Sequence, residues 1–316
     1  ENLFQTRSKK EGDRTKRVTG HGVNRKRKGL ITEERGLFLE KEVKVQENKM
    51  GVMPVAKLLL TMSVPMMISM LVQALYNIVD SIFIAKISDN AMTALSLVYP
   101  IQNLITAITV GFAIGTNAVI SIHLGAGNKK EADRAASLGT LLNAFHGLLL
   151  MIVCLTFIRP FLELFTADQD VISLGIRYAR ITLSFSIPIG ISISLEKIFQ
   201  ATGRMKVSMV AMMAGCIGNI ILDPLMIFGI GPFPAMGIEG AAIATAIGQM
   251  LSLVIYLVFC VVRPLPVTFS LSCCKPSKQL LLRLYTVGIP ATLNLALPSL
   301  LVSTLNGILA AYSQSY

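Results

Sequence analysis

The stretch Gly215-Cys-Ile-Gly-Asn219-Ile-Ile-Leu-Asp223-Pro224-Leu-Met-Ile-Phe228 is the part of the sequence from which the fold follows. It is an apolar run with an amide and a carboxylate four residues apart, a spacing that places Asn219 and Asp223 on one face of a helix. Asp223 is the only charged residue between Val207 and Phe228. A carboxylate there costs about 3 kcal/mol or more in lipid, so it normally faces a protein interior or a wet cavity. The residue either packs helices together by hydrogen bonding or has a functional role, and we favour the functional role.

The composition is typical of a protein that crosses a membrane several times. Of 316 residues, 53% are hydrophobic, and the mean hydropathy is +0.63. Residues 1–50 hold 14 Lys or Arg and 8 Asp or Glu, whereas all the remaining residues hold only 15 and 10. Such sparse charge beyond residue 50 disfavours a soluble globular core.

Residues 1–50 have no sustained apolar period and are predicted to be a disordered, basic cytoplasmic tail. Glu1-Asn-Leu-Phe-Gln5 resembles the remainder of a protease tag, so this end is left out of the fold prediction. The basic cluster Arg25-Lys-Arg-Lys28 has no aromatic residues between its charges. We therefore expect a solvated tail and no nucleic-acid partner.

Six apolar runs of membrane-spanning length precede Arg263, at residues 58–85, 97–122, 136–158, 174–196, 205–228 and 238–261. A seventh begins near Gln279. The prediction is an all-α polytopic membrane protein: a six-helix bundle over residues 51–262, a cytoplasmic loop over 263–278, and the first helix of a second, truncated bundle over 279–316. Lys57-Leu-Leu-Leu…Pro65 and Gln279-Leu-Leu-Leu…Pro290 open runs one and seven alike, which is typical of a duplicated transporter.

The loop charges predict an orientation in the cell membrane. Connections on the side of the tail carry a group of basic residues, namely Lys129, Lys130, Arg134, Lys197, Arg204, Lys206, Arg263, Lys275, Lys278 and Arg283. Connections on the opposite side are mainly acidic, although Arg177 and Arg180 lie near that side as an exception. Because positive charge favours the cytoplasmic side, the N-terminus is predicted to be cytoplasmic.

Nothing in the sequence predicts an enzyme, a bound cofactor or a structural metal. The five cysteines have no metal-ligand spacing, and the three histidines are scattered.

Polar side chains of three predicted helices converge at one depth. The first helix contains Gln73, Tyr76, Asn77 and Asp80 before it ends near Lys86. Asp80 and Asp223 each lie about six residues, roughly 9 Å, before the end of their helix on the same side of the membrane. Thr245 of the sixth helix lies at about the same depth. Two carboxylates in a poorly solvated pocket share a proton or recruit a cation, and their oxygen ligands suit Na⁺ as well as H⁺. Asn117 of the second helix is a weaker cavity candidate.

These motifs resemble the multidrug and toxic compound extrusion (MATE) family. The likeness rests on Leu75-Tyr76-Asn77-Ile-Val-Asp80, on Gly111 to Gly127, and on Asn219…Asp223-Pro-Leu-Met-Ile-Phe-Gly229 followed by Gly240-Ala-Ala-Ile-Ala-Thr245. It covers residues 55 to about 312. The resemblance implies two six-helix lobes, about twelve helices in all, that exchange H⁺ or Na⁺ for amphipathic, often cationic compounds across the lipid bilayer.

The resemblance also implies roles for single residues. Family members with a cation site in the first lobe would place its Asp at Asp80, its Asn and Asp at Asn219 and Asp223, and its Thr at Thr245. The Pro that bends the first helix would fall on Pro65. Because family members have about twelve helices, this chain is expected to be a fragment whose partner, the helices of the second lobe, is missing.

Two other functions fit parts of the pattern. A flippase for lipid-linked saccharides shares the two-lobe plan but would carry a cluster of basic residues in its cavity. An intramembrane aspartyl protease needs two membrane aspartates, but neither an adjacent Tyr-Asp pair at Asp80 nor a Gly-x-Gly-Asp motif at Asp223 is present. A membrane receptor that only binds ligand would need large extracellular loops, which the sequence lacks.

Overall fold

The computed structural model describes residues 53–263, 265–270 and 277–313. The chain divides into two compact units, Glu1–Leu58 and Leu59–Tyr316. Of the first unit only residues 53–58 are described, and residues 55–58 among them are already helical. The tail predicted over residues 1–50 lies outside the described residues, and so do residue 264 and residues 271–276 of the loop predicted over 263–278. Everything below concerns the second unit.

Helices account for nearly all of the described chain. Their bounds are α3 Val55–Ala85, α4 Asp89–Gly125, α5 Lys129–Glu163, α6 Gln169–Ser184, α7 Ser186–Ala201, α8 Met205–Phe228, α9 Ile238–Val262 and α10 Lys278–Ser313. Six of these are long and apolar enough to cross a membrane, and the bent pair α6–α7 makes a seventh when counted as one span. The predicted all-α membrane fold is therefore confirmed.

Several helices extend beyond the apolar runs because polar residues cap them. The side chain of Ser88 accepts a hydrogen bond from the amide of Ala91 at 3.0 Å and begins α4 eight residues before its predicted start. Asn128 caps α5 in the same way, and Asp168 caps α6. Gly127, with φ of 73°, ends the preceding turn in the left-handed region that glycine tolerates.

The fourth predicted helix is not continuous. The sequence predicts one helix over 174–196, whereas the structure has α6 and α7, which meet at Phe185 with a bend of 48°. Pro188 explains the break, because it has no amide hydrogen and its ring clashes with the carbonyl group one turn earlier, at Ser184. The span also extends to Ala201. Lys197, which was predicted to lie in a loop, is therefore part of α7 and is buried.

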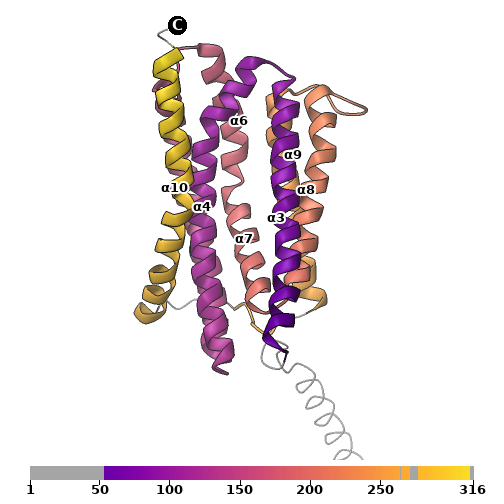
Figure 1. The fold of residues 1–316 in the computed structure, drawn as a ribbon, viewed down its shortest axis with the longest axis vertical. Helices are drawn as coiled ribbons and strands as arrows, with labels where there is room; N and C mark the ends of the chain where they lie inside the picture. The colour runs from indigo at the N-terminus through magenta and orange to yellow at the C-terminus, as the bar shows by residue number, and fades with distance from the viewer. Residues whose placement is uncertain (1–52, 264, 271–276, 314–316) are drawn as a thin grey trace, which may run out of the picture. The chain divides into compact units, whose positions relative to one another are not determined.

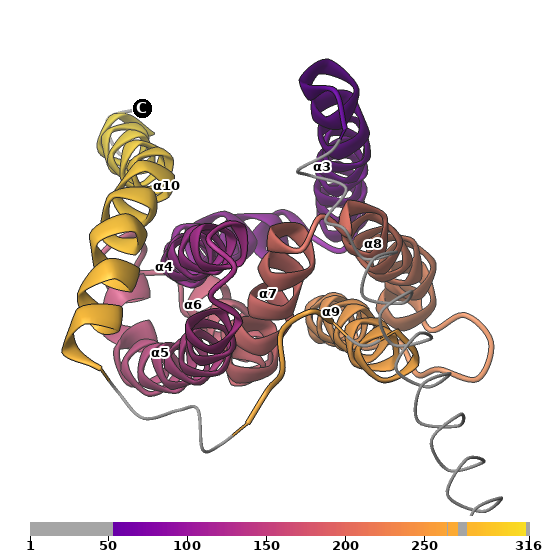
Figure 2. The same cartoon turned by 90° about the horizontal axis from the view of Figure 1, so that it is seen from below.

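The helices pack around α4 and α7 (Figures 1 and 2). On one side α4 packs against α10, and on the other side it packs against α5, α6 and α7. Beyond α7, α9 packs against α8, and α3 runs beside α8. We call the end of the bundle with the loops after α3, α5 and α8 the Gly229 end. The opposite end, with the turns after α4 and α7, is the Asn128 end.

Two apolar cores occupy the two ends. One cluster near the Gly229 end includes Ile84, Val98 and Leu162 with residues of α6 and α9, and the other, near the Asn128 end, includes Ile120, Ile198 and Phe199. Between them, the buried amide of Asn143 donates hydrogen bonds to backbone carbonyls of α4 and α7 and to the hydroxyl of Ser194. Most large apolar side chains on the outer face of α3 are exposed.

Candidate functional site

The acidic residues predicted to share one layer lie together between α3, α8 and α9. Asp80 of α3 is 8% exposed, Asn219 of α8 is 2% exposed and Asp223 of α8 is fully buried. Asn219 and Asp223 are four residues apart on one face of α8, as the helical repeat requires. The spacing in the sequence determines the helix face on which Asn219 and Asp223 lie. The packing of α8 against α9 then brings Thr245 next to them.

Asn219 joins the two helices that carry this layer. Its Nδ2 atom donates to Oδ1 of Asp223 at 3.3 Å and to the hydroxyl oxygen of Thr245, also at 3.3 Å. The close packing that allows this contact comes from glycines: the backbones of Gly215 in α8 and Gly248 in α9 lie so near that a methyl group on either would collide with the other helix. Close helix approach and the polar contact therefore have the same cause.

Tyrosines from two helices complete the cluster. The hydroxyl of Tyr76, which is buried, interacts with the side chain of Thr245. Asp80 lies close enough to Asp223 for their charges to interact. Tyr178 of α6 is also buried, and its hydroxyl lies near the side chain of Gln102 and within electrostatic reach of both carboxylates. Together these side chains are called the acidic cluster, which consists of Tyr76, Asp80, Tyr178, Asn219, Asp223 and Thr245.

The cluster has more acceptors than donors. Three buried oxygen atoms have no hydrogen-bond partner among the described residues: Oδ1 of Asp80, Oδ1 of Asn219 and Oδ2 of Asp223. A buried polar atom without a partner costs about 1–3 kcal/mol, and more if it is charged. Three such oxygens in one layer fit a proton or a small monovalent cation, since either supplies the positive partner that the side chains lack.

The other predicted site residues lie elsewhere. Gln73, one turn before Tyr76, accepts a weak hydrogen bond from the thiol of Cys216 at 3.7 Å. Asn77 is exposed on α3. Asn117 donates instead to the backbone carbonyl of Lys197 at 2.9 Å, and this bond joins α4 to the last turn of α7. The structure thus brings Asp80, Tyr76, Asn219, Asp223 and Thr245 together, but not Asn77 or Asn117.

Pro65 lies inside α3, which continues on both sides of it. The hydroxyl of Ser69 donates to the carbonyl of Pro65 at 2.9 Å, a side-chain bond of the kind that often accompanies a bend in a helix.

Sequence reasoning missed Tyr178 and Gln102. A tyrosine in an amphipathic helix does not by itself indicate a site. The neighbouring Arg177 and Arg180 of α6 indicate a polar surface on that helix instead. Among the residues that the structure describes, no group of three or more His, Cys, Asp or Glu side chains is arranged to hold a metal ion.

Comparison with known proteins agrees with the geometry. The family profile MatE matches residues 65–225. The multidrug export protein MepA of Staphylococcus aureus is 29% identical over 260 residues, which are 82% of this chain and 57% of MepA. Among solved structures, a MOP superfamily transporter from Pyrococcus furiosus superposes with a TM-score of 0.71 at 30% identity, covering 76% of this chain and 52% of the transporter. A MATE structure described as being in the bent conformation matches with a TM-score of 0.70 at 30% identity, covering 75% and 52%.

These matches place the chain within a known architecture. It spans between half and three fifths of the length of the proteins it matches. The residues matched by the profile, 65–225, include most of α3 and most of α8. The profile covers half of the sequence, and the solved transporters share the helical fold of this chain. The chain is therefore a multi-pass membrane protein that belongs to the MATE family.

Proposed function

We propose that this chain is the first lobe of a secondary antiporter that exchanges H⁺ or Na⁺ for amphipathic, often cationic compounds across the cell membrane. MepA is described as a multidrug export protein, which supports efflux as the direction. The observation that carries the proposal is the set of three unpaired buried oxygens in the acidic cluster. Such a set is costly in a cluster that only packs helices, but it suits a site that takes up and releases a positive ion.

The ion would bind at Asp80 and Asp223, with the side-chain oxygens of Asn219 and Thr245 as neutral ligands. Asn219 already contacts Asp223 and Thr245, so its amide links α8 to α9 at this layer. Asp80 comes from α3, which packs less closely than the other helices. Binding of the ion would therefore favour the arrangement in which α3 lies against α8.

Coupling follows from this difference between states. A ligand shifts a conformational equilibrium only by the difference in its affinity for the two arrangements. A shift from 1:99 to 99:1 needs about 5.5 kcal/mol. Hydrogen bonds to charged groups contribute roughly 1.5–3 kcal/mol each, whereas a neutral ligand contributes about 1 kcal/mol. The two carboxylates are thus indispensable, and the two neutral ligands adjust the affinity.

The remaining parts of the transporter follow the family plan. Residues 51–262 are assigned to the first lobe and α10 to the beginning of the second, so the helices of a second lobe are the expected partner. We propose that Pro65 lets α3 bend between two conformations. Two matched MATE structures are described as being in a straight and in a bent conformation, which supports a transporter with two forms. Substrates would reach the site from the cavity between the lobes.

The orientation is part of the same proposal. The Asn128 end carries most of the basic connections and is assigned to the cytoplasm, together with the N-terminus. A cysteine introduced at Lys129 should not react with a membrane-impermeant maleimide added outside intact cells, and it should react after permeabilisation. Labelling in intact cells would reverse the orientation.

The decisive test replaces each acid by its amide in the longest natural form of the protein. Asp80→Asn and Asp223→Asn keep the shape and most hydrogen bonds, and each should abolish efflux of a fluorescent cation driven by an ion gradient. The double variant should be no worse than either single one, because residues acting as one unit are not additive. Asn77→Ala, on the exposed side of the same helix, is the control and should transport normally. Full transport by Asp80→Asn at normal expression would refute the proposal.

A further inference from the structure

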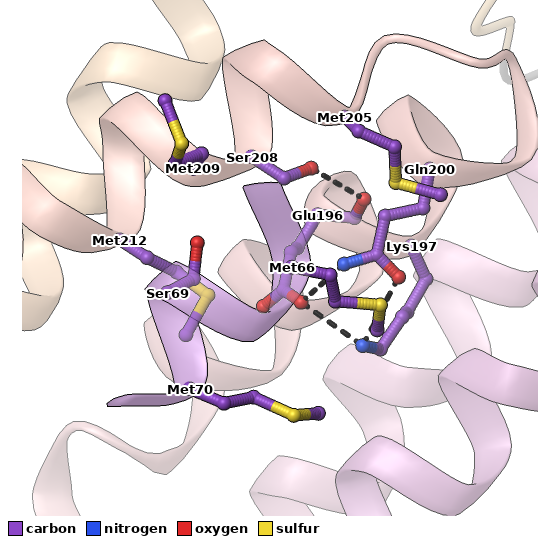
Figure 3. Close-up of a pocket in the computed structure, with 10 residues that line it drawn as sticks. All are labelled: Met66, Ser69, Met70, Glu196, Lys197, Gln200, Met205, Ser208, Met209 and Met212. Carbon is purple, nitrogen blue, oxygen red and sulfur yellow. Dashed lines mark hydrogen bonds and ion pairs between the residues drawn. The ribbon is translucent and has the colours of Figure 1, made fainter. Parts of the chain in front are cut away.

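A second polar cluster lies at the Asn128 end, well away from the acids. It occupies a pocket between α3, α7 and α8, whose walls carry five methionines, namely Met66, Met70, Met205, Met209 and Met212 (Figure 3). Its polar side chains are Glu196, Lys197 and Gln200 from the last turns of α7, with Ser69 and Ser208 nearby.

The three α7 residues form a closed set of contacts. Lys197 Nζ donates to Glu196 Oε1 at 2.9 Å and to Gln200 Oε1 at 3.2 Å, and Gln200 Nε2 donates to Glu196 Oε1 at 2.7 Å. The side chains of Glu196 and Lys197 are only 15% and 10% exposed. Neighbouring residues on a helix do not naturally face each other, so this pair forms only because both side chains turn into the same pocket.

A buried ion pair is a weak source of stability. Removing two charges from water costs several kcal/mol, and an apolar pair of similar size is often as stable or more stable. The end of α7 is held independently, since the backbone carbonyls of Lys197 and Glu196 accept hydrogen bonds from Asn117 of α4 and Ser208 of α8. Fixing this end of the helix therefore does not require the charges.

Both charged groups keep unused bonding capacity. Lys197 has three N–H donors, of which its hydrogen bonds to Glu196 and Gln200 use two. The hydrogen bonds of the Glu196 carboxylate both fall on Oε1. In Figure 3 the second oxygen of that carboxylate carries no contact to another residue drawn. The pocket thus presents a positively charged hydrogen-bond donor, the ammonium group of Lys197, beside a negatively charged acceptor, the carboxylate of Glu196. The two charges sum to zero.

The methionine walls suit the apolar part of a ligand. Methionine side chains are unbranched and polarisable, so they adapt to ligands of different shape and contact aromatic rings favourably. The cavity itself has a volume of about 40 Å³, far below the roughly 300–1,000 Å³ of a pocket that encloses a drug-sized molecule. It can therefore hold only the polar end of a ligand, while the apolar part lies along the methionines of α3 and α8.

From this arrangement we propose that Glu196 and Lys197 bind the headgroup of a zwitterionic amphipathic substrate, and that Lys197 makes the site prefer zwitterions to simple cations. The ligand's ammonium group would contact Oε2 of Glu196, and its carboxylate would accept from the remaining N–H of Lys197. The inference rests on the proposed function only in taking the ligand to be a transported compound. It concerns binding, and no ion gradient enters it.

A set of three fluorescent probes separates the charges. Nε-dansyl-lysine is zwitterionic at neutral pH, its methyl ester is a cation, and its Nα-acetyl derivative is an anion. Binding to the purified protein in detergent is followed by dansyl fluorescence without any gradient. The zwitterion should bind about tenfold more tightly than either derivative, because each derivative lacks the charged group that would contact one of the two pocket charges.

Variants identify the residues responsible. Lys197→Gln should prefer the ester, and Glu196→Gln should prefer the acetyl derivative. The double variant with both changes leaves no unpaired buried charge, so it is expected to fold, and it should bind all three probes within about threefold of each other. Met209→Leu keeps both charges and should retain the zwitterion preference.

Two results would overturn the assignment: a wild-type protein that binds the ester as tightly as the zwitterion, or one that binds none of the probes at millimolar concentration. A preference that survives in the double variant would also overturn it. Failure of the ion-coupling proposal would appear separately, as transport by Asp80→Asn, and would leave the order of the three probe affinities unchanged.

Discussion

Gly248→Ala should separate α8 from α9 at the point where the two helices support the acidic cluster. A Cβ atom on Gly248 would lie 2.7 Å from the carbonyl oxygen of Gly215 and 3.1 Å from Cβ of Asn219, whereas ordinary contacts begin at 3.4 Å. Relief of the closer contact requires a shift of about 0.7 Å, the difference between 3.4 and 2.7 Å. Because Thr245 lies one turn away on the same helix, its 3.3 Å contact with Asn219 would lengthen to about 4 Å, which is too long for a hydrogen bond.

The energetic effect can be isolated with a matched control. Overpacking of this kind lowers the free energy of unfolding by about 1–3 kcal/mol. Replacing a helical glycine by alanine raises it by about 1 kcal/mol, because alanine has the higher helix propensity. Gly218→Ala receives the same propensity gain, but its new methyl group meets only the flexible end of Leu251 at 3.1 Å. Gly248→Ala should therefore be less stable than Gly218→Ala by about 1–3 kcal/mol.

The assay combines stability with function. Thermal unfolding in detergent compares the two alanine variants, and dye efflux at graded ion concentrations reports the apparent ion affinity. The lost hydrogen bond is worth about 1 kcal/mol, so the ion concentration for half-maximal transport should rise about fivefold to tenfold in Gly248→Ala. Equal melting temperatures and unchanged ion dependence in the two variants would refute the reasoning.

Three further changes test other parts of the fold. Asn143→Ala removes an amide that three acceptors share, so unfolding in detergent should require about 2–3 kcal/mol less; a loss below 0.5 kcal/mol would contradict this. Gly115→Leu forces a side chain against the carbonyl of Leu284 in α10, so cysteine cross-linking between α4 and α10 should fall, whereas Gly125→Leu, with open space around it, should leave cross-linking intact. Asn128→Ala removes the cap of α5 and should lower stability by about 1 kcal/mol in the same unfolding measurement, and an unchanged melting curve would argue against the cap.

The sequence predicts the membrane spans well because hydropathy reports the hydrocarbon core directly. The predicted bounds of α8 agree with the structure, since both of its ends coincide with the ends of the apolar run. The starts of α4 and α5 are less accurate, because their first turns are polar and are fixed by Ser88 and Asn128. Helix ends outside lipid depend on capping rather than on hydropathy.

The acidic layer was predictable because two spacing rules act together. The repeat of the helix places Asn219 above Asp223, and the helix lengths place Asp80 and Thr245 at a similar depth. Tyr178 could not be found in this way, because its position depends on how α6 packs.

The burial of the pair Glu196–Lys197, in contrast, could not be predicted from the sequence. Two adjacent charges at the end of an apolar run are typical of a loop, and positive charge at that end fits the expected orientation. The structure buries them because α7 continues to Ala201 and because Gln200 satisfies both. Composition alone does not distinguish a solvated lysine from a buried lysine whose partners come from the same turn.

The break at Phe185 divides the fourth span into two short helices, α6 and α7, that can tilt independently. An unbroken helix transmits a push along its axis, because every residue is tied to the next turn. Here α6 is anchored in the apolar core at the Gly229 end and α7 in the core at the Asn128 end, and the joint between them bends by 48°. A tilt of α7 need not displace Tyr178, so the pocket at Glu196 and Lys197 can rearrange while the acids keep their surroundings.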